Sequence, residues 1–294
     1  MPKYRSQNRR FMEQDSKLAQ HQTIDIGQVV AKKFKKQLPR FVVRALEKLI
    51  RQDEINDFLM KYGHLDGVNF AHQLVNRFQI KLDLLHEDRL PNNPRALFIC
   101  NHPLGAMDGI CLASIISKHY GTSVRYIVND MLLFLKPLRD IFVPVNTLSG
   151  QSRESVLKIN EALATDFPVL TFPAGMCSRK INGEITDLPW KKSFVNQAIR
   201  SRRDIVPLYF HGYNSSFFYN IEKFRKAIGI NFNIGTALLP REMFATQDKH
   251  FTIVVGDPVS YQQLKESNQS ADELAQLLRN KVYNLRYEVT NVTI

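Results

Sequence analysis

Cysteine is scarce in this chain, and long apolar runs are missing from it. Cys100, Cys111 and Cys177 form no Cys-x-x-Cys pair and no spacing with histidine that would indicate a metal site. We therefore expect reduced thiols, as in a cytoplasmic protein, and no metal. No stretch reaches the roughly 18 apolar residues of a membrane-spanning helix, and no apolar stretch follows the basic N-terminus as in a signal peptide. If the protein meets lipid, it is expected to lie on the membrane surface.

Acidic residues are also few relative to basic ones. The 294 residues include 40 Lys and Arg against 28 Asp and Glu, a formal net charge of +12, and 44% are hydrophobic. The apolar share is enough for the core of one large domain, or of one domain with an appendage. Thirteen basic and four acidic residues precede residue 52, so most of the excess lies in the first sixth of the chain. Such a charge indicates an anionic partner, either a nucleic acid or an anionic bilayer.

The basic N-terminal segment has two parts. Residues 1–22 are polar and lack apolar periodicity, which predicts a loose arm. From residue 24 to about residue 60, apolar residues recur at helical spacing among basic ones, which predicts two amphipathic helices broken near Pro39. A solvated helix face or a nucleic-acid patch has the same pattern, but docking on an anionic membrane fits it as well. The candidate membrane-binding residues are Lys32, Lys33, Lys35 and Lys36.

From about residue 90 onward, short apolar runs alternate with helical patterns. This alternation predicts an α/β fold with a mixed, mostly parallel sheet flanked by helices. The expected strands lie near 95–100, 123–128, 141–145, 168–172, 204–210 and 251–256. The expected helices span 108–119, 153–166, 189–202, 216–228 and 271–288. Functional residues in such folds sit in the loops that leave the C-terminal ends of the strands.

The first of two unusual strand ends is 100-CNHPLGAMDGI. His102 stands at the end of the strand and Asp108 about one turn into the next helix, so the two side chains can meet across the loop. An imidazole held by a carboxylate at one nitrogen is a general base able to activate a hydroxyl. The same stretch is also compatible with simple turn chemistry and a helix-capping Asp108.

The second unusual strand end is 171-TFPAGMCSRK. Pro173 and Gly175 predict an irregular backbone, which could present amides and the side chains of Arg179 or Lys180 to an anion or an oxyanion. A third feature, 187-DLPWKKSF, opens a helix with two lysines just after that loop. Taken singly, these two patterns are also typical of a turn and of a solvated helix start.

Together the motifs resemble those of the glycerolipid acyltransferase superfamily, which contains lysophosphatidate and glycerol-3-phosphate acyltransferases. The segment 101-NHPLGAMD resembles its His–Asp block, 172-FPAGMCSR its Phe-Pro-Glu-Gly block and 205-IVPLYF its final Val-Pro block. This likeness covers about residues 90–260. A narrower likeness, over most of the chain, is to the bacterial hemolysin-like branch, which is associated with amino-acid-containing lipids such as ornithine and glycine lipids.

The resemblance implies an O-acyltransferase without metal or redox cofactor. His102 would be the general base and Asp108 its orienter, and the hydroxyl of a lyso-lipid would attack a thioester carried by acyl carrier protein or coenzyme A. The implied organisation is a basic arm with membrane-docking helices over residues 1–60 and a catalytic domain over residues 61–294, peripheral on the cytoplasmic face of the inner membrane. The implied substrate-binding residues are Asn101, Gly105, Phe172, Pro173, Gly175, Ser178, Arg179, Lys191 and Lys192.

The sequence departs from the family's common pattern at three points. Five residues separate His102 from Asp108 where most members have four, and Gly105 is expected to let the loop bulge. Ala174 stands where the family has Glu, and the arginine that should follow is displaced to Arg179. The stretch 141-IFVPVNTLSG lacks the arginine that usually follows that strand. Because arginine binds phosphate through a bidentate fork, these changes favour a lyso-aminolipid with one carboxylate over lysophosphatidate.

Two other functions are kept as alternatives. One is acylation of 1-acylglycerol-3-phosphate, with Arg179, Lys191 and Lys192 as substitute phosphate ligands. The other is a non-catalytic nucleic-acid-binding protein with a basic arm, which would account for the charge. The sequence has no aromatic–basic stacking motif and no recognition-helix pattern, so we expect no nucleic-acid partner.

Overall fold

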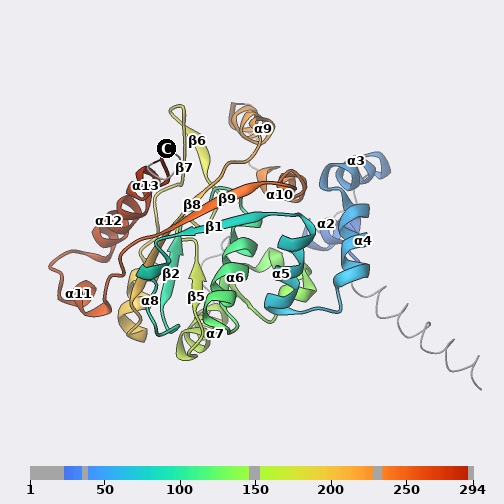
Figure 1. Ribbon diagram of the computed structural model, residues 1–294. Helices are drawn as coiled ribbons and strands as arrows, with labels where there is room; N and C mark the ends of the chain where they lie inside the picture. The colour runs from blue at the N-terminus through green and yellow to red at the C-terminus, as the bar shows by residue number, and fades with distance from the viewer. Residues whose placement is uncertain (1–22, 35–38, 146–152, 228–233, 291–294) are drawn as a thin grey trace, which may run out of the picture.

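The computed structural model describes residues 23–34, 39–145, 153–227 and 234–290. A seven-stranded sheet in the order β1-β9-β8-β2-β5-β3-β4 forms its centre (Figure 1). Neighbouring strands are parallel except β8 and β9, which confirms the predicted mixed, mostly parallel α/β fold. The strands are β1 (Lys81–Leu85), β2 (Leu97–Cys100), β3 (Arg125–Asn129), β4 (Phe142–Val145), β5 (Val169–Thr171), β8 (Ile205–His211) and β9 (His250–Val255).

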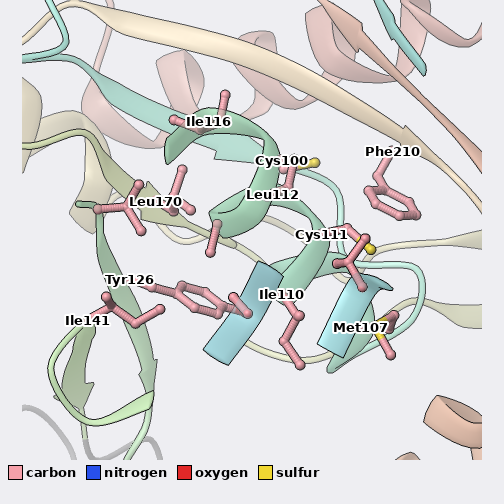
Figure 2. Packing of buried hydrophobic residues seen from close by; sticks show 14 of the residues in the cluster. Cys100, Met107, Ile110, Cys111, Leu112, Ile116, Tyr126, Ile141, Leu170 and Phe210 are labelled. Atoms are coloured by element: carbon pink, nitrogen blue, oxygen red, sulfur yellow. The ribbon is translucent and has the colours of Figure 1, made fainter. Parts of the chain in front are cut away.

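Helices cover both faces of the sheet, as the alternation of side chains along β2 illustrates. Phe98 and Cys100 belong to a core shared with α6, part of which Figure 2 shows. Leu97 and Ile99 belong to a second core shared with α7, α8 and α12. Burial on both faces explains why the central strands are continuous apolar runs. The helices after β1 are α6 (Met107–Tyr120), α7 (Arg153–Ala164), α8 (Ser193–Ser201), α9 (Ser216–Ala227), α10 (Ile234–Phe244), α11 (Tyr261–Glu266), α12 (Ala271–Asn284) and α13 (Arg286–Thr290).

The chain before β1 forms α2 (Ile26–Phe34), α3 (Arg40–Ile50), α4 (Gln52–Tyr62) and α5 (Gly67–Arg77). The predicted interruption near Pro39 falls between α2 and α3. A second break, at Arg51 in the left-handed conformation with φ 56°, was not predicted. Leu49 of α3 packs in a small core with residues of α9 and α10, so α3 rests on the rest of the protein. The predicted domain boundary after residue 60 falls inside α4, and the division into two domains stays a prediction.

The four candidate membrane-binding lysines lie next to or within a gap in the described residues. Lys32 and Lys33 belong to α2, for which the structure describes the backbone at these two positions but not their side chains. Lys35 and Lys36 lie outside the described residues. Within the described ranges, no helix has both the length and the apolarity needed to cross a bilayer.

Two predicted helices differ in extent from the structure. The helix expected over 189–202 begins only at Ser193, and the preceding residues, which include the buried Trp190, have no regular secondary structure. The helix expected over 271–288 is divided into α12 and α13 at Leu285. Several elements had no sequence prediction: β1, α5, α10, α11 and the hairpin of β6 (Arg179–Ile181) and β7 (Glu184–Thr186).

Candidate active site

His102 and Asp108 meet across the loop that joins β2 to α6. His102 Nδ1 lies 2.9 Å from Asp108 Oδ2, and the Asp108 side chain is fully buried. The backbone N–H groups of Leu104 and Gly105 donate to the same oxygen, and that of Gly109 donates to Oδ1. Asp108 is therefore fixed by the first turn of α6 and the loop before it. Because the carboxylate accepts at Nδ1–H, the imidazole keeps Nε2 as its proton acceptor.

The His102 ring is also held on its face. It stacks on Phe172, the residue that follows β5, with ring centroids 3.9 Å apart and planes inclined by 20°. Tyr126 of β3 makes an edge-to-face contact with Phe172, with ring centroids 5.6 Å apart. The His102 side chain remains 11% exposed, so the imidazole is mostly buried but still accessible from solvent. Phe172, which was expected to contact substrate, lies against one face of the His102 ring.

Gly105 allows the loop its five-residue length. Its φ is +78°, in the left-handed region, and a Cβ there would lie 2.6 Å from Leu239 Cδ2 and 2.9 Å from Cys177 Cβ. The loop that contains Gly105 is therefore in close contact with α10 and with the loop after β5. A side chain at position 105 would disturb three segments at once.

Asn101 ties β2 to β8. Its side-chain amide donates to the carbonyl of Phe210 at 3.0 Å, and its amide oxygen accepts from the Phe210 N–H at 2.7 Å. Asn214, just beyond β8, donates to the carbonyl of Pro103 at 3.1 Å. The end of β8 therefore supports the histidine loop from the side opposite to β5. Asn101 was predicted to bind substrate, but these hydrogen bonds already occupy its amide.

The loop over residues 172–179 lies against the histidine loop. The Ser178 N–H donates to the carbonyl of His102 at 2.7 Å. Gly175 has φ +69°, and Pro173 accepts a backbone hydrogen bond from Lys191 at 3.1 Å. The structure thus brings together the candidate blocks around residues 102, 175 and 191.

Asp187 lies within this site, although sequence reasoning did not select it. Its buried carboxylate accepts from the His102 N–H at 3.2 Å, the Ser178 hydroxyl at 2.6 Å and the Trp190 indole N–H at 2.9 Å. Burial raises the pKa of Asp187, and hydrogen bonds from Ser178 and Trp190 and the nearby His102 ring oppose that rise. The only sequence signal was its place at the head of 187-DLPWKKSF.

Arg179 is turned away from solvent. Its Nε lies 3.2 Å from Glu222 Oε2 of α9, and both side chains are buried. Its Nη1 also donates to the carbonyl of Cys177 at 2.7 Å and contacts the Cys177 sulfur at 2.8 Å. Burial raises the pKa of the Cys177 thiol to about 11, although the Arg179 cation opposes the rise. The cation of Arg179 is thus compensated inside the protein, and Cys177 is held as a thiol.

The two lysines before α8 differ in their surroundings. A Cβ on Gly175 would lie 3.4 Å from Lys191 Nζ, so the Lys191 ammonium sits beside the 172–179 loop. Among the described residues no acidic side chain forms an ion pair with Lys191. Lys192 instead pairs with Asp272 of α12 at 2.7 Å on the surface. Over the same described residues, no group of three or more His, Cys, Asp or Glu side chains is arranged to hold a metal ion.

Comparison with known proteins identifies relatives over most of the chain. A lyso-glycine lipid O-acyltransferase of Phocaeicola vulgatus is 40% identical over 265 residues, which are 89% of this chain and 95% of that protein. A protein of the same name from Bacteroides thetaiotaomicron is 38% identical over 89% of this chain and 97% of its own. The crystal structure of the 1-acyl-sn-glycerophosphate (LPA) acyltransferase PlsC from Thermotoga maritima, 12% identical, covers 89% of this chain and 88% of its own with a TM-score of 0.42.

The family model described as acyltransferase matches residues 28–291, nearly the whole chain. The match includes both loops of the site, most of α2, and α3 and α4 as well as the sheet. The chain therefore belongs to the acyltransferase family and is an enzyme that transfers acyl groups.

Proposed function

We propose that this enzyme transfers a fatty acyl group from a thioester to the hydroxyl of a lyso-glycine lipid. The observation that carries the proposal is the 2.9 Å contact between His102 Nδ1 and the buried carboxylate of Asp108. The two relatives named lyso-glycine lipid O-acyltransferases support the choice of acceptor. Acyl carrier protein and coenzyme A both carry a thioester of the required kind.

In the proposed reaction His102 Nε2 removes the proton of the acceptor hydroxyl as its oxygen attacks the thioester carbonyl carbon. The new C–O bond forms, the tetrahedral intermediate collapses, and the C–S bond breaks. The imidazolium returns its proton to the departing thiolate, so that no external acid or base is consumed. Asp108 stabilises the imidazolium and holds its tautomer, as the carboxylate of a catalytic triad does.

The charges around the 172–179 loop support a head group with a single negative charge. Arg179, one of the residues expected from the sequence to bind the acceptor, already has a buried partner in Glu222. Lys191 has none among the described residues and lies beside Gly175. We assign the carboxylate of the acceptor to Lys191. A phosphate monoester, with a charge near −2, would require a second cation to offset its desolvation.

The lipid acceptor implies work at a membrane surface. We propose that α2 and α3 dock on the anionic cytoplasmic leaflet as a peripheral attachment. The exposed face of α3 supports this, since Phe41 is 75% exposed and shares that face with Arg44 and Lys48. An aromatic side chain among cations is the composition of an interfacial helix.

Acyl transfer by the purified enzyme tests the proposal. Lyso-glycine lipid and lysophosphatidate should be offered in parallel, each with acyl carrier protein and coenzyme A thioesters. We expect lyso-glycine lipid to be acylated at least about tenfold more efficiently, a difference of about 1.4 kcal/mol in transition-state stabilisation. Preference for lysophosphatidate would replace the proposed acceptor by 1-acylglycerol-3-phosphate. In a deletion strain, the acylated glycine lipid should disappear and its lyso form accumulate.

A further inference from the structure

Asp187 is a buried carboxylate for which the proposed chemistry has no use. It lies between β7 and α8 and is 1% exposed. Its three hydrogen-bond donors are uncharged, and none of the described Lys, Arg or His side chains forms an ion pair with it. Arg279 approaches only the backbone carbonyl of Asp187, at 3.0 Å. A buried carboxylate without a cationic partner is costly to maintain, so its contacts point to a role.

Those contacts close a ring around the backbone of His102. Asp187 Oδ1 accepts from both the His102 N–H and the Ser178 hydroxyl. The Ser178 N–H in turn donates to the His102 carbonyl. One carboxylate oxygen thus joins the histidine loop to the 172–179 loop, and the peptide groups on both sides of His102 are held.

This anchor completes the restraint of the imidazole. Asp108 fixes one ring nitrogen and Phe172 supports one ring face, but neither determines where the main chain of His102 lies. If the backbone shifted, the ring would follow. Displacements of about 1 Å at a reacting group can cost about a hundredfold in rate.

We propose that Asp187 is a positioning residue that holds the backbone of His102 in register with the 172–179 loop and thereby aims Nε2 at the acceptor hydroxyl. The inference rests on the proposed role of His102. Asn at position 187 can still accept both hydrogen bonds through its amide oxygen, whereas Ala accepts none. The third hydrogen bond comes from the buried Trp190 and involves no atom of either loop.

The test is steady-state kinetics of D187A, D187N and W190F, with thermal melting of each. D187A should lose about a hundredfold in kcat, with KM for lyso-lipid and thioester changed less than about threefold. D187N should recover at least about tenfold of that loss. W190F removes a hydrogen bond from the same carboxylate and should keep kcat within about threefold, even if it melts earlier.

The proposal is overturned if folded D187A keeps kcat within about threefold, if its loss is confined to KM, or if W190F loses as much kcat as D187A. If D187A does not fold, the kcat of S178A is measured instead, because this variant removes the hydrogen bond from Ser178 to Asp187. S178A should lose at least about tenfold more kcat than W190F, and equal losses in the two variants overturn the inference. If H102A remains active, the proposed function is refuted. If H102A is inactive while the Asp187 variants stay active, only the role of Asp187 is refuted.

Discussion

At the residue scale, the imidazole of His102 has a single nitrogen available for proton transfer. H102A should therefore lower kcat/KM by about 10³-fold, while D108N should lose less, about a hundredfold, because the base survives with a wrongly biased tautomer. Both variants should keep the circular dichroism spectrum and the vesicle binding of the unmodified enzyme. Near-normal turnover in H102A would be incompatible with the mechanism.

Gly105 offers a test of how tightly the loop is enclosed. G105A combines a positive φ with a Cβ that would overlap Leu239 and Cys177, so we expect a loss of about 2–4 kcal/mol in the free energy of unfolding and a lower kcat. Gly121, at the end of α6, has φ +62° and open space around it. G121A is the matched control and should show only the backbone cost, about 1 kcal/mol, with normal kcat. Equal destabilisation of the two variants would contradict the close approach of the three segments.

Lys191 and Lys192 are adjacent in sequence but differ in their partners. K191A should raise KM for lyso-glycine lipid about tenfold, because a hydrogen bond to a charged group is lost, and should leave KM for the thioester unchanged. K192A removes a cation that is paired with Asp272 on the surface and should change neither value by more than about twofold. The role assigned to Lys191 does not survive if both variants behave alike.

The residues of the site differ in how far sequence alone could identify them. His102 and Asp108 are six positions apart on a strand, a loop and a helix, so local geometry brings them together. Asp187 reaches His102 across 85 positions, and the compensation of Arg179 by Glu222 depends on where α9 packs. No local pattern encodes such contacts. They follow only from the tertiary arrangement of the sheet and the helices around it.

At the scale of elements, burial decided which strands could be predicted. β2 and β8 are buried along almost their whole length, and their apolar runs are visible in the sequence. β1 is the edge strand next to β9, half exposed and partly charged, and the strands of the β6–β7 hairpin have three residues each. The residue at the break between α3 and α4 is Arg51, not the glycine or asparagine that usually indicates a left-handed conformation. Short, polar or exposed elements therefore leave too little signal.

The exposed face of α3 is the element on which the docking proposal depends most directly. The variant F41S/R44E/K48E should abolish co-sedimentation with anionic vesicles while activity on micellar substrate is largely kept, because Leu49 still packs on α9 and α10. L157S/K158E makes the same kind of change on α7, whose Leu157 is also exposed, and should sediment normally. Reversal of Lys32, Lys33, Lys35 and Lys36 to Glu should also release the protein. If neither F41S/R44E/K48E nor the four-lysine reversal changed the sedimentation, this N-terminal segment would serve only to pack on the core.

At the scale of the whole molecule, the uneven distribution of charge matters more than its sum. The first 51 residues hold most of the net +12, whereas the rest of the chain is close to balanced. We expect this N-terminal segment to be attracted to an anionic leaflet, and each basic residue near such a surface contributes about 1 kcal/mol. Within the segment, α3 packs beside α10, and Leu239 of α10 contacts the histidine loop. Attraction by charge would thus bring the candidate active site to the surface where a lipid acceptor resides.

Salt provides the measurement that separates this attraction from catalysis. The screening length falls from about 10 Å at 0.1 M to about 3 Å at 1 M salt, so acylation of a lyso-lipid in anionic vesicles should decline steeply over that range. Acylation of the same lyso-lipid in neutral detergent micelles should change little, because the chemistry at His102 needs no surface charge. Vesicles of zwitterionic lipid alone should give slow acylation at every salt concentration. If salt reduced both reactions equally, its effect would lie in the active site, and the basic N-terminal segment would have no part in reaching the acceptor.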